Sequence, residues 1–144
     1  MGRILVVDDE SHSREGLRDS LARDGHAVET AADGWQAIRK IKEGRFDLAV
    51  IDLDLAPYQG VALTGWDLAR IVRAYHPGLP IIILAAEEWR PERRQAEDLR
   101  VSQVLEKPIS LAELKALARA HTAPAARTGA PARLAGAQAG KGRA

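Results

Sequence analysis

The sequence has 144 residues, of which 46% are hydrophobic and 28% charged, values that suit one soluble globular domain with a packed core. It has no cysteine, which excludes a disulfide framework and a thiolate metal site, and no apolar run long enough for a membrane anchor or signal peptide, so we expect a cytoplasmic protein. The formal net charge of +1 is unevenly distributed, because all 20 acidic residues precede residue 121, and this argues against a nucleic-acid-binding surface on the folded part.

The first half of the chain alternates apolar runs with helical patterns. Residues 4–7, Ile-Leu-Val-Val, predict a buried strand. The next segment has leucines four residues apart and ends at Gly25, which predicts a helix with a glycine at its C-terminal cap. Residues 26–30 alternate weakly and predict a second strand, after which Asp33 is suited to cap a helix that ends at Gly44.

The same alternation continues after residue 44. Leu-Ala-Val-Ile at residues 48–51 predicts a third strand that ends at Asp52. Thr64 followed by Asp67 resembles a capping box and predicts the start of the third helix. Residues 81–84, Ile-Ile-Ile-Leu, form the most strongly apolar predicted strand.

Two further elements complete the pattern. Pro91 is suited to the first position of a fourth helix that runs to about Leu99, residues 101–105 predict the fifth strand, and Ser110 with Glu113 predicts the start of the last helix. Five strands that alternate with five helices predict an α/β fold with a doubly wound parallel sheet. Such sheets place their functional site beyond the carboxyl ends of the strands.

The last segment of the chain differs in composition. Residues 121–144 are rich in Ala, Gly and Pro, carry four basic residues and no acidic ones, and contain one large apolar residue, Leu134. This composition buries too little surface to offset chain entropy. We therefore predict a folded domain over residues 1–120 and a flexible basic tail over residues 121–144.

Charged residues follow three of the predicted strands. Asp8 and Asp9 come after the first strand, Asp52 after the third, and Lys107 after the fifth. Neighbouring carboxylates repel each other by roughly 1–4 kcal/mol per pair, and Mg2+ relieves this repulsion while it keeps positions for phosphate oxygens. With Mg2+ and Lys107 present, an oxygen of Asp52 can attack phosphorus in line and form an aspartyl phosphate.

Three motifs carry a resemblance to a known family. VVDDE after the first strand, FDLAVIDLDL around the third and LEKPIS before the last helix resemble the receiver domain of two-component response regulators, over about residues 1–120. The resemblance implies a flavodoxin-like sheet with strand order 2-1-3-4-5 and Asp52 as phosphoacceptor. It also implies Mg2+ bound by Asp8, Asp9, Asp52 and the backbone carbonyl of Asp54, a phosphoryl contact from Lys107, and a cis peptide bond after Lys107.

The chain departs from this family at three places. Ala85 stands where the family has a Ser or Thr that binds a phosphoryl oxygen, and Val104 stands where it has a switch aromatic. The family's glycine matches Gly60, but the helix-opening pattern returns only after Thr64, which indicates that about five residues are inserted after Asp52. In addition, Pro57 lies one position later than the family's proline. We thus expect an atypical receiver in which phosphate acceptance is retained and the ordinary output switch is not.

Several functional hypotheses follow. In the first, a stand-alone receiver takes phosphate from a histidine kinase or a histidine phosphotransfer protein, and signals by contact with an unknown downstream protein through the fourth helix, fifth strand and last helix. A homodimer through this face stays open, and we expect no membrane contact and no enzymatic activity beyond transfer to the protein itself. In the second, a degenerate receiver acts as a phosphorylation-independent interaction module.

Two minor alternatives concern the segment Asp52-Leu53-Asp54. Asp54 is an alternative phosphoacceptor, because residues two apart in an extended chain point to the same side. The Asp-x-Asp pattern also occurs in phosphatases of the haloacid-dehalogenase type, although there it lies on the first strand. Elsewhere we expect Glu87 and Glu88 in a solvated loop, the tryptophans in core or rim packing, and all four histidines, His26 included, at the surface.

Overall fold

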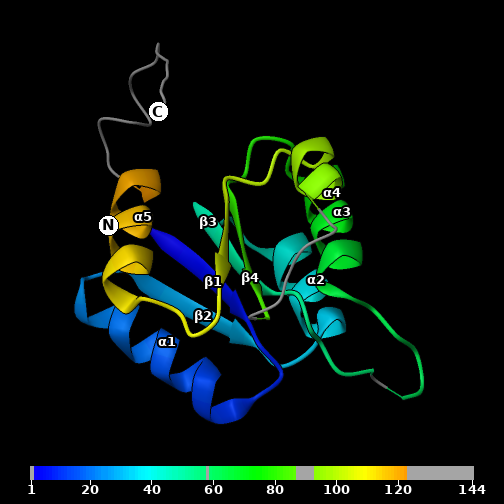
Figure 1. The fold of residues 1–144 in the computed structure, drawn as a ribbon, viewed down its shortest axis with the longest axis horizontal. Helices are drawn as coiled ribbons and strands as arrows, with labels where there is room; N and C mark the ends of the chain where they lie inside the picture. The colour runs from blue at the N-terminus through cyan, green and yellow to red at the C-terminus, as the bar shows by residue number, and fades with distance from the viewer. Residues whose placement is uncertain (1, 58, 87–92, 123–144) are drawn as a thin grey trace.

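A five-stranded parallel sheet organises the molecule (Figure 1). The structure is a computed structural model, and it describes residues 2–57, 59–86 and 93–122. The sheet order is β2-β1-β3-β4-β5, and every neighbouring pair is parallel, which confirms the predicted doubly wound, flavodoxin-like α/β fold. The strands are β1 (Arg3–Val7), β2 (Ala27–Ala31), β3 (Leu48–Asp52), β4 (Ile81–Ala85) and β5 (Gln103–Glu106).

Helices cover both faces of the sheet. Figure 1 shows α1 and α5 on one side and α2, α3 and α4 on the other. Among the described residues, none of these helices combines the length and apolar character that crossing a bilayer requires. The helices are α1 (Ser11–Arg23), α2 (Gly34–Glu43), α3 (Gly65–Tyr75), α4 (Arg93–Asp98) and α5 (Leu111–Thr122).

The core lies in two layers, because successive side chains of a strand point to opposite faces. In β1, Leu5 and Val7 pack in the layer beneath α2 and α3, and Ile4 and Val6 pack in the layer beneath α1 and α5. All four side chains are buried, and burial of one such side chain contributes about 1.5–3 kcal/mol. The two layers therefore fix the central strands, and with them the edge where these strands end.

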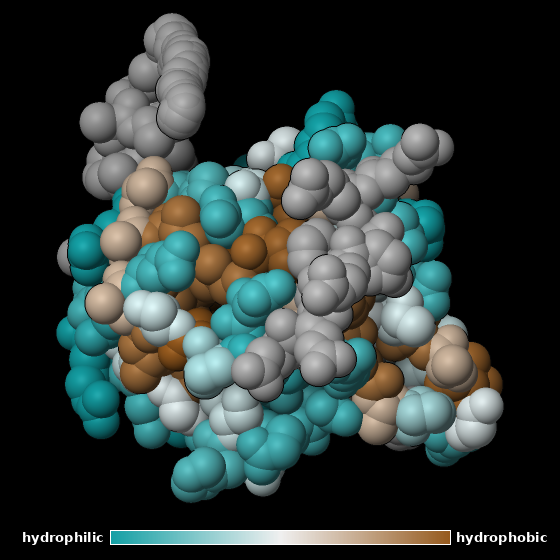
Figure 2. All heavy atoms as spheres, viewed as in Figure 1, coloured by the Kyte–Doolittle hydropathy of each residue, from teal (hydrophilic) through white to brown (hydrophobic). Residues whose placement is uncertain are grey.

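The connection between β3 and α3, the β3–α3 loop (residues 53–64), projects from the body of the molecule (Figure 1). Its two ends are joined, because the Gly65 N–H donates to the Leu53 carbonyl at 2.9 Å. A Cβ at Gly65 would lie 2.6 Å from the Asp52 carbonyl oxygen, so only glycine allows α3 to begin this close to β3. Near the outer end, Gly60 has φ +79 and Val61 is half-exposed, and Figure 2 shows apolar residues gathered at that end.

Several boundaries differ from the predicted ones. The fifth strand begins at Gln103 rather than at Val101, since Arg100 has φ 55 and the chain turns before it joins the sheet. The last helix continues to Thr122, which is buried, so it includes two residues that the composition assigns to the tail. Pro91, Glu87, Glu88 and residues 123–144 lie outside the described residues, so the expectations for them stay predictions.

His26 is buried, and the prediction that it lies at the surface is wrong. It is 6% exposed, and its Nδ1 accepts the Gly2 N–H at 3.3 Å. Burial lowers the pKa of His26, because the protonated ring loses hydration. Its position directly after the Gly25 turn carries no sequence signal for burial.

Candidate functional site

The site begins with the acidic pair that follows β1. Asp8 is 1% exposed, its N–H donates to the Ala31 carbonyl at 3.1 Å, and its Oδ1 accepts the Glu10 N–H at 3.0 Å. Arg14, in the first turns of α1, donates to the Asp8 carbonyl at 2.8 Å and holds this turn in place. The Oδ2 atom of Asp8 is buried and has no hydrogen-bond partner among the described residues, so it offers an acceptor to a cation.

Asp52 is the last residue of β3 and lies beside Lys107. It is 2% exposed, its Oδ1 accepts the Asp54 N–H at 3.0 Å, and its Oδ2 accepts Nζ of Lys107 at 2.8 Å. Lys107 directly follows β5, and its main-chain N–H donates to the Ala85 carbonyl at 2.8 Å, which extends the pairing of β4 with β5. The ammonium is therefore positioned by the sheet itself.

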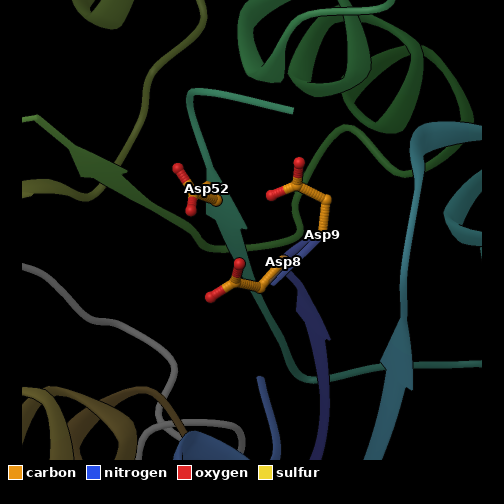
Figure 3. Close-up of side chains that lie close together, drawn as sticks. All are labelled: Asp8, Asp9 and Asp52. Atoms are coloured by element: carbon orange, nitrogen blue, oxygen red, sulfur yellow. The ribbon is translucent and has the colours of Figure 1, made fainter. Parts of the chain in front are cut away.

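Three carboxylates converge at this edge. One oxygen each of Asp8, Asp9 and Asp52 lies within 4.8 Å of the others, and Figure 3 shows the three side chains gathered where β1 and β3 end. Together with the Lys107 ammonium, three carboxylates leave a formal charge of −2 in the cluster. A divalent cation that prefers oxygen ligands, such as Mg2+, fits both this charge and this donor set.

Burial and neighbouring charges shift the ionisation of Asp52 and Lys107. Burial raises the pKa of Asp52, against the hydrogen bonds from Lys107 and Asp54, and the charge of Asp8 raises it further. Burial alone would lower the pKa of Lys107, but the hydrogen bond and charge of Asp52 outweigh it and raise that pKa. The shift of Asp52 therefore comes mainly from its burial, and the shift of Lys107 from its contact with Asp52.

An open cleft of about 680 Å3 gives access to the cluster. All five residues that the sequence analysis assigns to the site line it, namely Asp8, Asp9, Asp52, Asp54 and Lys107. The structure therefore brings together residues from three strand ends that are up to 99 positions apart in the chain. Their chemical roles stay predictions.

The match to a protein family decides the identity of this fold and site. Residues 4–119 match the family model of the response regulator receiver domain. The chain belongs to the response-regulator receiver family.

Relatives of this receiver include response regulator MprA of Mycobacterium sp. (strain KMS), which is 39% identical over 118 residues, covering 82% of this chain and 49% of that protein. The chain thus spans about half the length of the curated relatives that it matches. Among solved structures, the Francisella response regulator 1452 receiver domain has a TM-score of 0.76 and 26% identity, over 90% of this chain and all of that one. TrrA of Thermotoga maritima, solved in complex with Mg(2+)-BeF, has a TM-score of 0.70 and 29% identity, over 84% of this chain and 99% of that one.

Two features of the receiver agree with what the motifs imply. The Lys107–Pro108 peptide bond is cis. Asp52 lies on the third strand of the chain and inside the carboxylate cluster, whereas the side chain of Asp54 is exposed. The cluster thus contains the side chain of Asp52, and family membership removes the support for a phosphatase of the haloacid-dehalogenase type.

Two positions on β4 and β5 depart from the family pattern, as the sequence analysis expects. Ala85 ends β4, is fully buried and brings no hydroxyl to the site. Val104, in β5, is half-buried and packs against the core layer beneath α2 and α3. Neither side chain can donate a hydrogen bond to a phosphoryl oxygen.

One contact of the site carries no signal that sequence motifs detect. The Ala56 N–H, in the β3–α3 loop, donates to Oδ2 of Asp9 at 3.0 Å. Sequence motifs do not identify backbone hydrogen-bond donors. The one indirect indication is the late position of Pro57, which leaves residue 56 with an N–H. The first part of the β3–α3 loop is therefore connected to the carboxylate cluster.

Proposed function

We propose that this receiver accepts a phosphoryl group on Asp52 in two-component phosphorelay signalling. The observation that carries the proposal is the environment of the Asp52 carboxylate. It is buried between two further carboxylates, and Lys107 lies 2.8 Å from its Oδ2. A buried carboxylate with one fixed cation and room for a second is suited to attack a phosphoryl group whose charge both cations neutralise.

The proposed step balances as a transfer between two nucleophiles. An oxygen of Asp52 forms a bond to phosphorus while the bond from phosphorus to the imidazole nitrogen of a phosphohistidine breaks, and the leaving imidazole takes up a proton. Lys107 already donates to Asp52, and it moves little to contact a phosphoryl oxygen by a charge-assisted hydrogen bond. No substrate other than the protein itself is turned over.

Mg2+ would be held by Asp8, Asp9, Asp52 and the backbone carbonyl of Asp54. The unpartnered Oδ2 of Asp8 and the formal charge of −2 support this assignment. When bound, Mg2+ neutralises charge on the carboxylates and on the incoming phosphoryl oxygens. The side chains of this receiver would orient the bound cation and the incoming phosphoryl group.

The proposed partners follow from the chemistry of the step. The phosphodonor is a histidine kinase or a histidine phosphotransfer protein, and the output is contact with a downstream protein. Phosphorylation adds a charge of about −1.5 to −2 at an edge where the chain already places three carboxylates. This added charge would bias the surrounding loops between two arrangements.

Acetyl phosphate tests the proposal without a cognate kinase. The chain is incubated with acetyl phosphate and Mg2+, and its intact mass is measured. We expect a gain of one phosphoryl group that disappears in Asp52→Asn and persists in the matched control Asp54→Asn. If Asp54→Asn loses the added mass and Asp52→Asn keeps it, Asp54 would be the phosphoacceptor and the proposal would be refuted.

A second candidate is a receiver that binds its partner without phosphorylation. The buried Ala85 and the half-buried Val104 favour it, because they remove a phosphoryl ligand and a switch side chain. In this case the mass of the chain stays unchanged with acetyl phosphate, although Mg2+ still binds. The same measurement therefore separates the two candidates.

A further inference from the structure

We infer that the backbone N–H of Ala56 positions Asp9 for the cation, and that the first part of the β3–α3 loop is thereby part of the metal site. The inference rests on the proposed function, since it concerns how the Mg2+ ligands of that site are held. It goes beyond that function because it assigns a role to a segment that the site motifs do not include.

The three carboxylates of the cluster are held by different parts of the fold. Asp8 is held by the Glu10 N–H, and Asp52 by the Asp54 N–H and by Lys107. Asp9 is exposed, and among the described residues its carboxylate has one hydrogen-bond donor, the Ala56 N–H at 3.0 Å. The orientation of Asp9 therefore depends on the loop.

The loop can supply a fixed donor because its base is anchored. The Asp54 N–H ties its first residues to Asp52, and the Gly65 N–H closes it on Leu53 at 2.9 Å. Pro57 restricts the residue before it to extended conformations. The N–H of Ala56 is thus presented by a restrained segment.

The sign of the effect follows from the chemistry of a carboxylate. Its two oxygens can serve two partners, so that one oxygen accepts the Ala56 N–H while the other faces a cation. Donors that hold a metal ligand in place typically strengthen metal binding by a factor of about 10 to 100. The loop should therefore tighten the binding of Mg2+ rather than compete with it.

Moving the proline tests this inference. Ala56→Pro deletes the N–H, and Ala56→Val is the matched control, because it alters the exposed side chain, keeps the N–H and adds no hydrogen-bonding group. Calorimetric titration of the full chain with Mg2+ should give a dissociation constant about 10- to 100-fold higher for Ala56→Pro and unchanged for Ala56→Val. Equal affinities of all three proteins, or tighter binding by Ala56→Pro, would refute the inference and leave the proposed function intact.

Absence of Mg2+ binding by the unsubstituted chain would instead refute the proposed function, and the inference with it. Hydrogen exchange of the Ala56 amide, followed by NMR in the unsubstituted chain, provides a second test if Ala56→Pro fails to fold. We expect added Mg2+ to slow this exchange, because coupling between the loop and the cation is reciprocal. An Ala56 amide that exchanges at the same rate with and without bound Mg2+ would contradict the inference.

Discussion

The two halves of the site differ in what they offer a phosphoryl group. The β1 and β3 half supplies three carboxylates, two of them buried, and each of the three accepts a hydrogen bond from a backbone N–H. The β4 and β5 half supplies the Lys107 ammonium, but Ala85 and Val104 bring no side-chain donor. The proposed phosphate acceptance therefore draws on both halves, whereas the two departures from the family pattern lie in the β4 and β5 half alone.

The largest effect should come from breaking the ion pair that joins the halves, between Lys107 and Asp52. Lys107→Met removes the ammonium that lies 2.8 Å from Asp52. We expect phosphorylation by acetyl phosphate to slow by roughly 100- to 1,000-fold, because a fixed donor to developing charge is lost. The rate is followed by intact mass with saturating Mg2+, and Lys115→Met, which lies on α5 outside the cleft, should react as the unsubstituted chain does.

The next largest effect should come from loosening the segments that lead into β4 and β5. Arg73→Met removes a guanidinium that donates to five main-chain carbonyls around the ends of α3 and α4, those of His76, Pro77, Leu79, Leu99 and Arg100. We expect the free energy of unfolding in urea to fall by roughly 2–3 kcal/mol, because several acceptors lose a shared donor. Arg70→Met, on the exposed side of the same helix, should change it by less than about 0.5 kcal/mol. If both variants lowered the free energy of unfolding equally, the hydrogen bonds of Arg73 to the five carbonyls would contribute no more to stability than an exposed arginine does.

A smaller effect should come from restoring the missing donor. Ala85→Thr places a hydroxyl at the end of β4, and we expect it to stabilise the phosphorylated protein by roughly 1–3 kcal/mol. The equilibrium constant for phosphorylation should then rise by a factor of about 5 to 150, which raises the yield of phosphorylated protein. Ala85→Val has the same shape as Thr without the hydroxyl, so it controls for packing at this fully buried position. A rise in both variants would attribute the effect to packing, and a rise in neither would point to another donor that already serves the phosphoryl group.

The smallest effect concerns the amino-terminal end of β1, where His26 accepts the Gly2 N–H. Burial holds the pKa of His26 below its ordinary value of 6.5, so the unfolded chain binds a proton that the folded chain rejects. Stability should thus be complete above about pH 6.5 and should fall as the pH drops through that value toward the lower folded pKa. Urea unfolding at about pH 7.5 and pH 5.5 checks this, and His26→Asn should reduce the difference whereas the exposed His12→Asn should not.

The sequence predicted the fold well where local and global signals agree. The apolar runs of β1, β3 and β4 are buried on both faces, so the same residues that favour a strand also fill the core. The capping box of Thr64 and Asp67 likewise appears as predicted, because it depends only on residues three apart. Boundaries near β5 were less predictable, since a turn with φ 55 at Arg100 delays a strand that the apolar pattern starts earlier.

The site was predictable in its side chains and not in its backbone contacts. Asp8, Asp9, Asp52 and Lys107 follow strand ends, and parallel strands bring such residues to one edge whatever their separation in the chain. The Ala56 N–H could not be assigned to Asp9 in this way, because its partner depends on the path of the chain after β3. The burial of His26 was missed for a related reason, since it depends on contact with Gly2, 24 residues away.

The hydrogen bond between Gly65 and Leu53 has a consequence for how this chain tolerates changes in length. The loop leaves and re-enters the body of the protein at nearly one point, so residues added near Gly60 would extend outward without shifting the strand or the helix that follow. The entropy cost of closing a longer loop grows only slowly, by about 0.6 kcal/mol for each doubling. A short epitope tag or reporter peptide inserted there should leave the core intact, which makes the loop a practical attachment point next to the reactive edge.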